Sequence, residues 1–159
     1  MRLESGEQLG SGQRLLLRIQ YLLVVATIVV AVLVWLPAPE FVAPLATAGL
    51  LLVLAYIWFV AGLQLVVPVL KDRDDILPGV LAVLAPAMAM AWAGLLAPPV
   101  WGAGLLFVAV LLQRLVERAP TFVALWPAQW QQSRRQQSQL LLVALASIGV
   151  AQWYPLYWG

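Results

Sequence analysis

The chain has 159 residues, of which 64% are hydrophobic and 10% charged, and its formal net charge is +2. Soluble domains carry about a quarter charged residues, so this composition excludes an ordinary soluble fold and predicts an all-α integral membrane bundle. Cysteine and histidine are absent, which excludes disulfides, thiol nucleophiles and imidazole metal sites. The nine basic residues are too few and too scattered to indicate a nucleic acid partner.

The first 36 residues predict a short leader and a first transmembrane helix. Residues 1–13 are polar and rich in Gly and Ser, which is typical of a flexible cytoplasmic leader, and we expect residues 14–159 to form a single transmembrane domain. An apolar run over residues 15–36 is long enough to cross the membrane and stops before Pro37. It exceeds the core of about 7 to 15 residues in a secretory signal, so cleavage is not expected.

A second helix is expected over residues 41–70, with Pro44 in its first turn and Pro68 near its end. Five charged residues follow at 71–75, which predicts an aqueous turn. The three aspartates there are oxygen donors of the kind that Mg²⁺ and Ca²⁺ prefer, but a lysine and an arginine interleave with them. We therefore expect no metal site in this turn.

A third helix is expected over residues 76–96, with a kink near Pro86, and a fourth over residues 100–118. In the third helix Ala85, Ala89 and Ala93 recur at every fourth position. This stripe of small side chains predicts a face that another helix can approach closely, from this chain, a protein partner or a second copy.

Residues 121–139 combine tryptophans with a glutamine-rich run. This pattern fits either a separate interfacial helix or the first turns of a fifth helix. The fifth span is expected over residues 139–157. An aromatic anchor is predicted at its end, formed by Trp153, Tyr154, Tyr157 and Trp158.

Five spans place all the basic residues on one side of the membrane. The leader and the loops after the second and fourth helices share that side, and they carry Arg2, Arg14, Arg18, Lys71, Arg73, Arg114, Arg118, Arg134 and Arg135. Positive charge favours the cytoplasmic side, so we expect the N-terminus inside, the C-terminus outside and a multi-pass protein of the bacterial inner membrane.

Two polar residues of the second helix are candidates for an intramembrane site. Gln64 needs a partner from another helix, because an unsatisfied amide in hydrocarbon costs several kcal/mol. Tyr56 lies eight residues earlier, on roughly the same helix face. An interhelical hydrogen bond that fixes packing and a ligand contact are both open for Gln64.

A second candidate site lies at the cytoplasmic boundary. Arg114, Glu117 and Arg118 are spaced i, i+3 and i+4, which predicts an ion pair of Glu117 with Arg114 along one helix. The alternative is a contact for a lipid headgroup, a quinone-type ligand or a protein partner. The next segment adds candidate contacts from Trp130, Arg134 and Arg135.

Residues 41–159 resemble an uncharacterised bacterial membrane-protein family related to the mitochondrial transmembrane protein sixty-nine. The resemblance rests on residues 59–65 (FVAGLQL), on the proline-interrupted third helix and on the spacing of Pro127, Trp130 and Arg134. The family pattern Gly-x-His-Trp would start at Gly62 and place glutamine, at Gln64, where the family has histidine. The resemblance implies a small inner-membrane protein, with the hydrogen bonding of that position retained and any histidine chemistry lost.

The length, the five expected spans and the eight tryptophans also resemble tryptophan-rich sensory proteins of the translocator type, although their Trp and Pro motifs are not visible. On function, we expect a structural, assembly or accessory subunit of a membrane complex, without catalytic groups or cofactors. The alternative is a bundle that binds or transports a small molecule or lipid, with Tyr56 and Gln64 in its interior.

Overall fold

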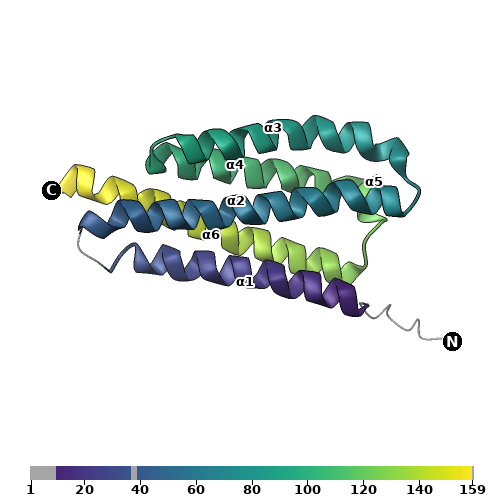
Figure 1. The fold of residues 1–159 in the computed structure, drawn as a ribbon, viewed down its shortest axis with the longest axis horizontal. Coiled ribbons are helices and arrows are strands. Elements are labelled where there is room, and N and C mark those ends of the chain that lie inside the picture. The colour runs from purple at the N-terminus through teal and green to yellow at the C-terminus, as the bar shows by residue number, and fades with distance from the viewer. Residues whose placement is uncertain (1–9, 37–38, 159) are drawn as a thin grey trace.

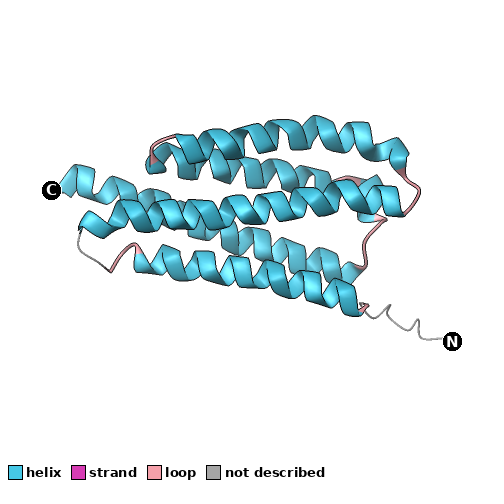
Figure 2. Ribbon diagram, viewed as in Figure 1, coloured by secondary structure: helices cyan, strands magenta, loops and turns pink. Residues whose placement is uncertain are grey.

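The computed structural model describes residues 10–36 and 39–158, and within them the chain is all-α (Figure 2). The helices are α1 (Ser11–Leu33), α2 (Pro39–Leu70), α3 (Leu77–Leu96), α4 (Pro99–Arg118), α5 (Pro120–Val123) and α6 (Ala128–Trp158), and a 3-10 turn η1 (Asp74–Ile76) precedes α3. The five long helices pack side by side as an elongated bundle (Figure 1).

The long helices lie where the sequence predicts them, except for the bounds of the first and the start of the last. Helix α1 runs from Ser11 to Leu33, so residues 11–13 of the expected leader are helical and the helix ends three residues before the predicted end at residue 36; residues 1–9 lie outside the described part of the chain. Helix α6 is continuous from Ala128, which shows that the glutamine-rich segment forms its first turns. The alternative of a separate interfacial helix over residues 121–139 was wrong, although the four-residue α5 precedes the segment.

Four helical segments of the described chain are long and apolar enough to cross a membrane, namely Ser11–Leu33, Glu40–Leu70, Asp74–Leu96 and Pro99–Arg118. They indicate a multi-pass membrane protein. Helix α6 differs because it starts with polar residues, and its apolar run begins only at Leu140.

The connections between the helices lie at two opposite ends of the bundle (Figure 1). The N-terminus of α1, the turn between α2 and α3, and α5 lie at one end. The end of α1, the start of α2, the α3–α4 connection and the end of α6 lie at the other. All described Lys and Arg residues belong to helix ends or loops at the first end, which we call the basic end: Arg14, Arg18, Lys71, Arg73, Arg114, Arg118, Arg134 and Arg135.

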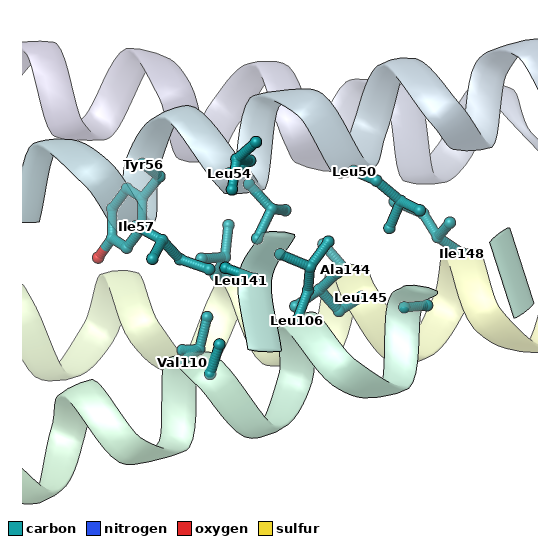
Figure 3. Close-up of a cluster of buried hydrophobic side chains, with 14 of the residues drawn as sticks. Leu50, Leu54, Tyr56, Ile57, Leu106, Val110, Leu141, Ala144, Leu145 and Ile148 are labelled. Carbon is teal, nitrogen blue, oxygen red and sulfur yellow. The ribbon is translucent and has the colours of Figure 1, made fainter. Parts of the chain in front are cut away.

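The core lies between α2, α4 and α6. Leu50, Ile57, Leu106, Leu141 and Ile148 are each at most 2% exposed, and they interlock along the bundle axis (Figure 3). Figure 3 also places Tyr56 at one end of this cluster, with its hydroxyl oxygen directed away from the aliphatic side chains. The cluster therefore ends in a polar group that needs a partner.

The outer surface of the bundle is apolar as well. Leu22 and Val143 are each 69% exposed, and Trp58 packs edge to face against Trp92 on the surface of α2 and α3, with ring centroids 6.2 Å apart. A soluble monomer rarely exposes apolar side chains so widely, so this surface suits contact with lipid chains.

Helices α3 and α4 approach each other closely through small residues. Gly94 and Gly102 face each other, and a Cβ atom on Gly102 would lie 2.3 Å from the carbonyl oxygen of Gly94. The alanine stripe expected to allow such an approach does not make it, because Ala85, Ala89 and Ala93 are all exposed. The face of α3 that packs inward carries Val80, Leu84, Ala87, Ala91 and Gly94 instead, so no helix of the described chain covers the stripe.

The charged turn after α2 ends the helix with a Schellman motif. The amide of Arg73 donates to the carbonyl of Pro68 (2.9 Å), the amide of Asp72 donates to that of Val69 (3.2 Å), and Asp72 has a left-handed φ of 51°. Arg73 also donates to Asp75 at 2.8 and 3.1 Å, and these hydrogen bonds hold the pKa of Asp75 below its ordinary value. No group of three or more acidic residues that could hold a metal ion occurs in the described ranges.

At the opposite end, Trp153 packs edge to face against Trp101 of α4, with ring centroids 6.5 Å apart. This is one member of the predicted aromatic anchor. The side chains of Tyr154, Tyr157 and Trp158 lie outside the described part of the structure.

Candidate functional site

Arg134 of α6 is the centre of a buried polar network at the basic end. The residue is 5% exposed, and its Nε donates to Glu117 Oε1 of α4 at 2.9 Å. A terminal guanidinium nitrogen donates to the same oxygen, and the other donates to the Tyr56 hydroxyl of α2 and to Gln137 Oε1. The guanidinium carbon also lies 5.1 Å from the centroid of the Tyr56 ring. Arg134 thus joins three helices.

Two buried glutamines extend this network between α2 and α4. Gln64 Nε2 donates to the Gln113 carbonyl and to Glu117 Oε1, each at 3.3 Å. A second hydrogen bond runs from α4 to α2, because Gln113 Nε2 donates to the Ile57 carbonyl of α2 at 2.8 Å. Both glutamines are 2% exposed, so water cannot satisfy their amide groups and these hydrogen bonds do so instead.

Helical spacing brings these groups to the same place. Gln113 and Glu117 are four residues apart and therefore share the face of α4 that meets α2. Arg134 and Ser138 have the same spacing on α6, and the Ser138 hydroxyl donates to the Arg134 carbonyl at 2.7 Å. The local helix geometry positions each side chain, and the packing of three helices makes the site.

The structure brings Tyr56, Gln64, Glu117 and Arg134 together, although they were predicted as members of two separate sites. Gln64 forms the interhelical hydrogen bonds expected of it. The predicted pairing of Glu117 with Arg114 was wrong, because Glu117 pairs with Arg134 of another helix. The buried guanidinium of Arg134 requires a counterion, whereas Arg114 is only half-buried and can stay hydrated.

Beside this network a cavity opens between α2, α4, α5 and α6, and we call it the arginine cleft. Its volume, counted out to the open mouth, is about 570 Å³. Its lining consists of Val60, Leu63, Gln64, Arg114, Glu117, Arg118, Phe122, Val123, Trp126, Trp130, Gln131, Arg134 and Arg135. All six residues predicted as boundary contacts are in this lining, together with Gln64, and Tyr56 adjoins it through Arg134.

The cleft is strongly basic. Four arginines line it against one carboxylate, Glu117, which already pairs with Arg134. The other three, Arg114, Arg118 and Arg135, form no ion pair within the described residues, and the last two are exposed. Several unpaired guanidinium groups around one cavity favour an anion, and their planar donors match the oxygens of a phosphate or carboxylate.

Aromatic rings form another wall of the cleft. The rings of Trp126 and Trp130 stack with their centroids 4.5 Å apart, and the ring centroid of Phe122 lies 6.3 Å from that of Trp126. The segment that carries Trp126 is fixed by two donors: Gln131 Nε2 binds the Val123 and Trp126 carbonyls, and Lys71 Nζ binds the Leu125 carbonyl at 2.7 Å. The wall is therefore tied to both α6 and the turn after α2.

Two residues of the cleft lining each have a buried polar atom without a hydrogen-bond partner within the described residues. These atoms are an acceptor, Gln64 Oε1, and a donor, Trp126 Nε1. An unsatisfied buried polar group costs about 1 to 3 kcal/mol, so each favours a ligand atom of complementary type.

Three network residues were not predicted from the sequence: Gln113, Gln137 and Ser138. The spacing gave a signal, because Gln113 lies four residues before Glu117, and Gln137 and Ser138 lie three and four residues after Arg134. Polar residues at these positions indicate a shared polar face.

Comparisons with family models, curated proteins and solved structures find no match to this chain. The resemblance to the family related to transmembrane protein sixty-nine therefore stays a prediction. Two segments that carry the resemblance meet at the arginine cleft, since Gln64 and Arg134 both bind Glu117.

Proposed function

We propose that this protein is a five-span protein of the bacterial inner membrane that binds the phosphate of a phospholipid headgroup in the arginine cleft. The observation that carries the proposal is the cleft itself, a cavity in which three arginines without an ion pair among the described residues lie beside stacked tryptophans at the basic end. The proposal includes no catalytic step.

Helix length supports five spans and a cleft that lies at the level of the lipid headgroups. Helix α6 has 31 residues and is about 46 Å long, whereas the hydrocarbon core is about 30 Å thick. Its apolar part from Leu140 onward suffices for a fifth span, and its polar first turns then extend to the headgroup level. Trp126 and Trp130 are typical residues of that level.

The orientation rests on charge. Because every described basic residue belongs to the basic end, the preference of Lys and Arg for the cytoplasm supports an inside N-terminus and a cleft that faces the inner leaflet. This leaflet supplies anionic phospholipids, which basic juxtamembrane clusters attract.

The composition of the cleft favours a phospholipid over a quinone-type ligand. A quinone is uncharged and would leave three guanidinium groups of the lining without an anion. A phosphodiester supplies the anion, and the apolar side chains Val60, Leu63 and Phe122 in the same lining suit the first carbons of the acyl chains.

Removing two cleft arginines tests the proposal. Arg118→Gln combined with Arg135→Gln is expected to weaken binding of an anionic phospholipid by about 30-fold, because each basic residue near the headgroup contributes about 1 kcal/mol. Lipid titration of the purified protein in detergent, read by native mass spectrometry, measures the dissociation constants.

The matched control is Arg14→Gln combined with Arg18→Gln, which removes the same charge from α1, outside the cleft lining. It should leave the dissociation constant within a few-fold of the unmodified value. Equal losses in both double variants would mean that general charge attraction, and not the cleft, binds the lipid.

A second role, as an accessory subunit, is favoured by the outward alanine stripe of α3. Ala85, Ala89 and Ala93 are exposed although their spacing suits close helix packing. Under this proposal Ala89→Phe removes a co-purifying partner or second copy, whereas Val143→Phe on α6 does not. Native mass spectrometry of complexes extracted from membranes distinguishes the two variants, and a monomer without partners before any substitution would rule this role out.

A further inference from the structure

We infer that the arginine cleft selects phospholipids whose headgroup carries a hydrogen-bond donor beyond the phosphate, either an ammonium N–H or a hydroxyl. The inference rests on the proposed lipid-binding function and concerns the specificity of that site. It comes from the different chemistry of the exposed and the buried lining of the cleft.

The arginines of the lining offer donors only. Arg118 and Arg135 are exposed guanidinium groups without an ion pair in the described structure, and beside them Trp126 adds Nε1, a buried donor without a hydrogen-bond partner among the described residues. Phosphate oxygens satisfy all three, because a phosphodiester accepts hydrogen bonds and donates none.

The buried lining offers acceptors. Gln64 is 2% exposed, and its Oε1 has no partner in the described residues, while its Nε2 is held by the Gln113 carbonyl and Glu117. The amide cannot exchange its oxygen and nitrogen without losing both of these hydrogen bonds. Oε1 is therefore fixed as an acceptor.

Glu117 adds a second acceptor beside Gln64. All the hydrogen bonds that it accepts from the described residues go to Oε1, from Arg134 and Gln64, so its other carboxylate oxygen is left for a further donor. Its side chain is 19% exposed, against 6% for Arg134, which keeps this oxygen within reach of the cleft.

A headgroup with both parts complements both kinds of lining. Its phosphate binds the arginines, and its terminal N–H or O–H donates to Gln64 Oε1 and Glu117. A choline headgroup has the same phosphate and positive charge as an ethanolamine headgroup, but its methyl groups donate no strong hydrogen bond. Choline leaves the buried acceptor unpaired, and such a mismatch costs enough to weaken binding by about 10-fold or more.

The test measures the affinity of the unmodified protein for phosphatidylethanolamine, its N-methyl and N,N-dimethyl derivatives, phosphatidylcholine and phosphatidylglycerol, all with the same acyl chains. We expect tight binding down the methylation series until the last N–H is lost, and then a drop of about 10-fold at phosphatidylcholine. Tight binding of phosphatidylglycerol as well identifies the hydroxyl as a second effective donor. No variant has to fold for this comparison.

A variant then assigns the acceptor. Gln64→Met keeps the length of the side chain but removes Oε1, and it should reduce the preference for phosphatidylethanolamine over phosphatidylcholine to less than about 3-fold. Gln20→Met is the matched control, because Gln20 is fully buried but does not line the cleft. It should leave the preference unchanged.

The outcomes separate this inference from the function on which it rests. Equal affinity for phosphatidylethanolamine and phosphatidylcholine, with binding still dependent on Arg118 and Arg135, overturns the donor selection and leaves lipid binding intact. If phosphatidylglycerol binds tightly but phosphatidylethanolamine binds no better than phosphatidylcholine, the ammonium N–H is not selected, and the donor selection is overturned too. Failure of every lipid to bind overturns both.

Discussion

Glu117→Leu is expected to destabilise the bundle by about 3 to 5 kcal/mol, the range observed when one partner of a buried ion pair is removed. The substitution leaves the guanidinium of Arg134 buried at 5% exposure, with only neutral partners, Tyr56 and Gln137. Neither can neutralise its charge. Chemical unfolding in detergent micelles, followed by tryptophan fluorescence, measures the change in free energy.

Removing Arg134 instead of Glu117 should destabilise the bundle less. Arg134→Met leaves the Glu117 carboxylate without its counterion, but that side chain is 19% exposed, it keeps the Gln64 hydrogen bond, and water can reach it from the cleft. The double variant should be more stable than Glu117→Leu alone, because it buries no charge at all. This order of stabilities distinguishes a buried charge from a simple loss of packing.

An exposed pair provides the control. Arg73 and Asp75 form the other ion pair of the described structure, and their side chains are 40% and 64% exposed. Removing both should have little effect on unfolding, since exposed pairs contribute little. If Glu117→Leu lowers the free energy of unfolding no more than this control does, then water reaches Arg134, and the network does not depend on the exclusion of water.

The ion pair also limits what Arg134 can do in the cleft. Its donors are committed to Glu117, Tyr56 and Gln137, so a bound phosphate would have to displace one of them. Arg114, Arg118 and Arg135 have no such commitments within the described residues. Stability and lipid binding should therefore respond to different arginines, which lets the two sets of variants be interpreted separately.

The helices could be predicted because the apolar runs and prolines mark their extent directly. Pro39, Pro99 and Pro120 stand at or next to helix starts, where a missing amide hydrogen is harmless, and the runs between them are long enough to span. The start of α6 could not be predicted, because a glutamine-rich segment is equally compatible with a surface helix and with an extension of a span. Packing against α1, α2 and α4 decides between them.

The candidate residues could be predicted, but their pairing could not. Spacing along one helix shows local partners such as Arg114 and Glu117, whereas the observed partner, Arg134, lies 17 residues further on in another helix. Within its glutamine-rich run Arg134 has the sequence character of an exposed residue. It is buried only because α6 passes Tyr56 and Glu117 at this level, which is a property of the tertiary fold.

The same limit applies to the glycines of α4. Gly102 and Gly104 are two residues apart, and nothing in the sequence tells them apart. In the structure a Cβ atom on Gly102 meets the Gly94 carbonyl at 2.3 Å and Leu50 Cδ1 at 3.0 Å, whereas one on Gly104 meets nothing within 4 Å. One position is essential to the packing of α3 on α4, and the other is open.

Gly102→Ala is therefore expected to destabilise the protein by about 1 to 3 kcal/mol, the usual range for overpacking. The clash is with backbone, so it cannot be relieved by a side-chain rotation, and α3 and α4 must separate instead. Gly104→Ala is the matched control, and it should be neutral or slightly stabilising, because alanine has a higher helix propensity than glycine. Unfolding midpoints of the two variants in the same detergent give the comparison. Equal midpoints would mean that the two helices do not pack at Gly94 and Gly102.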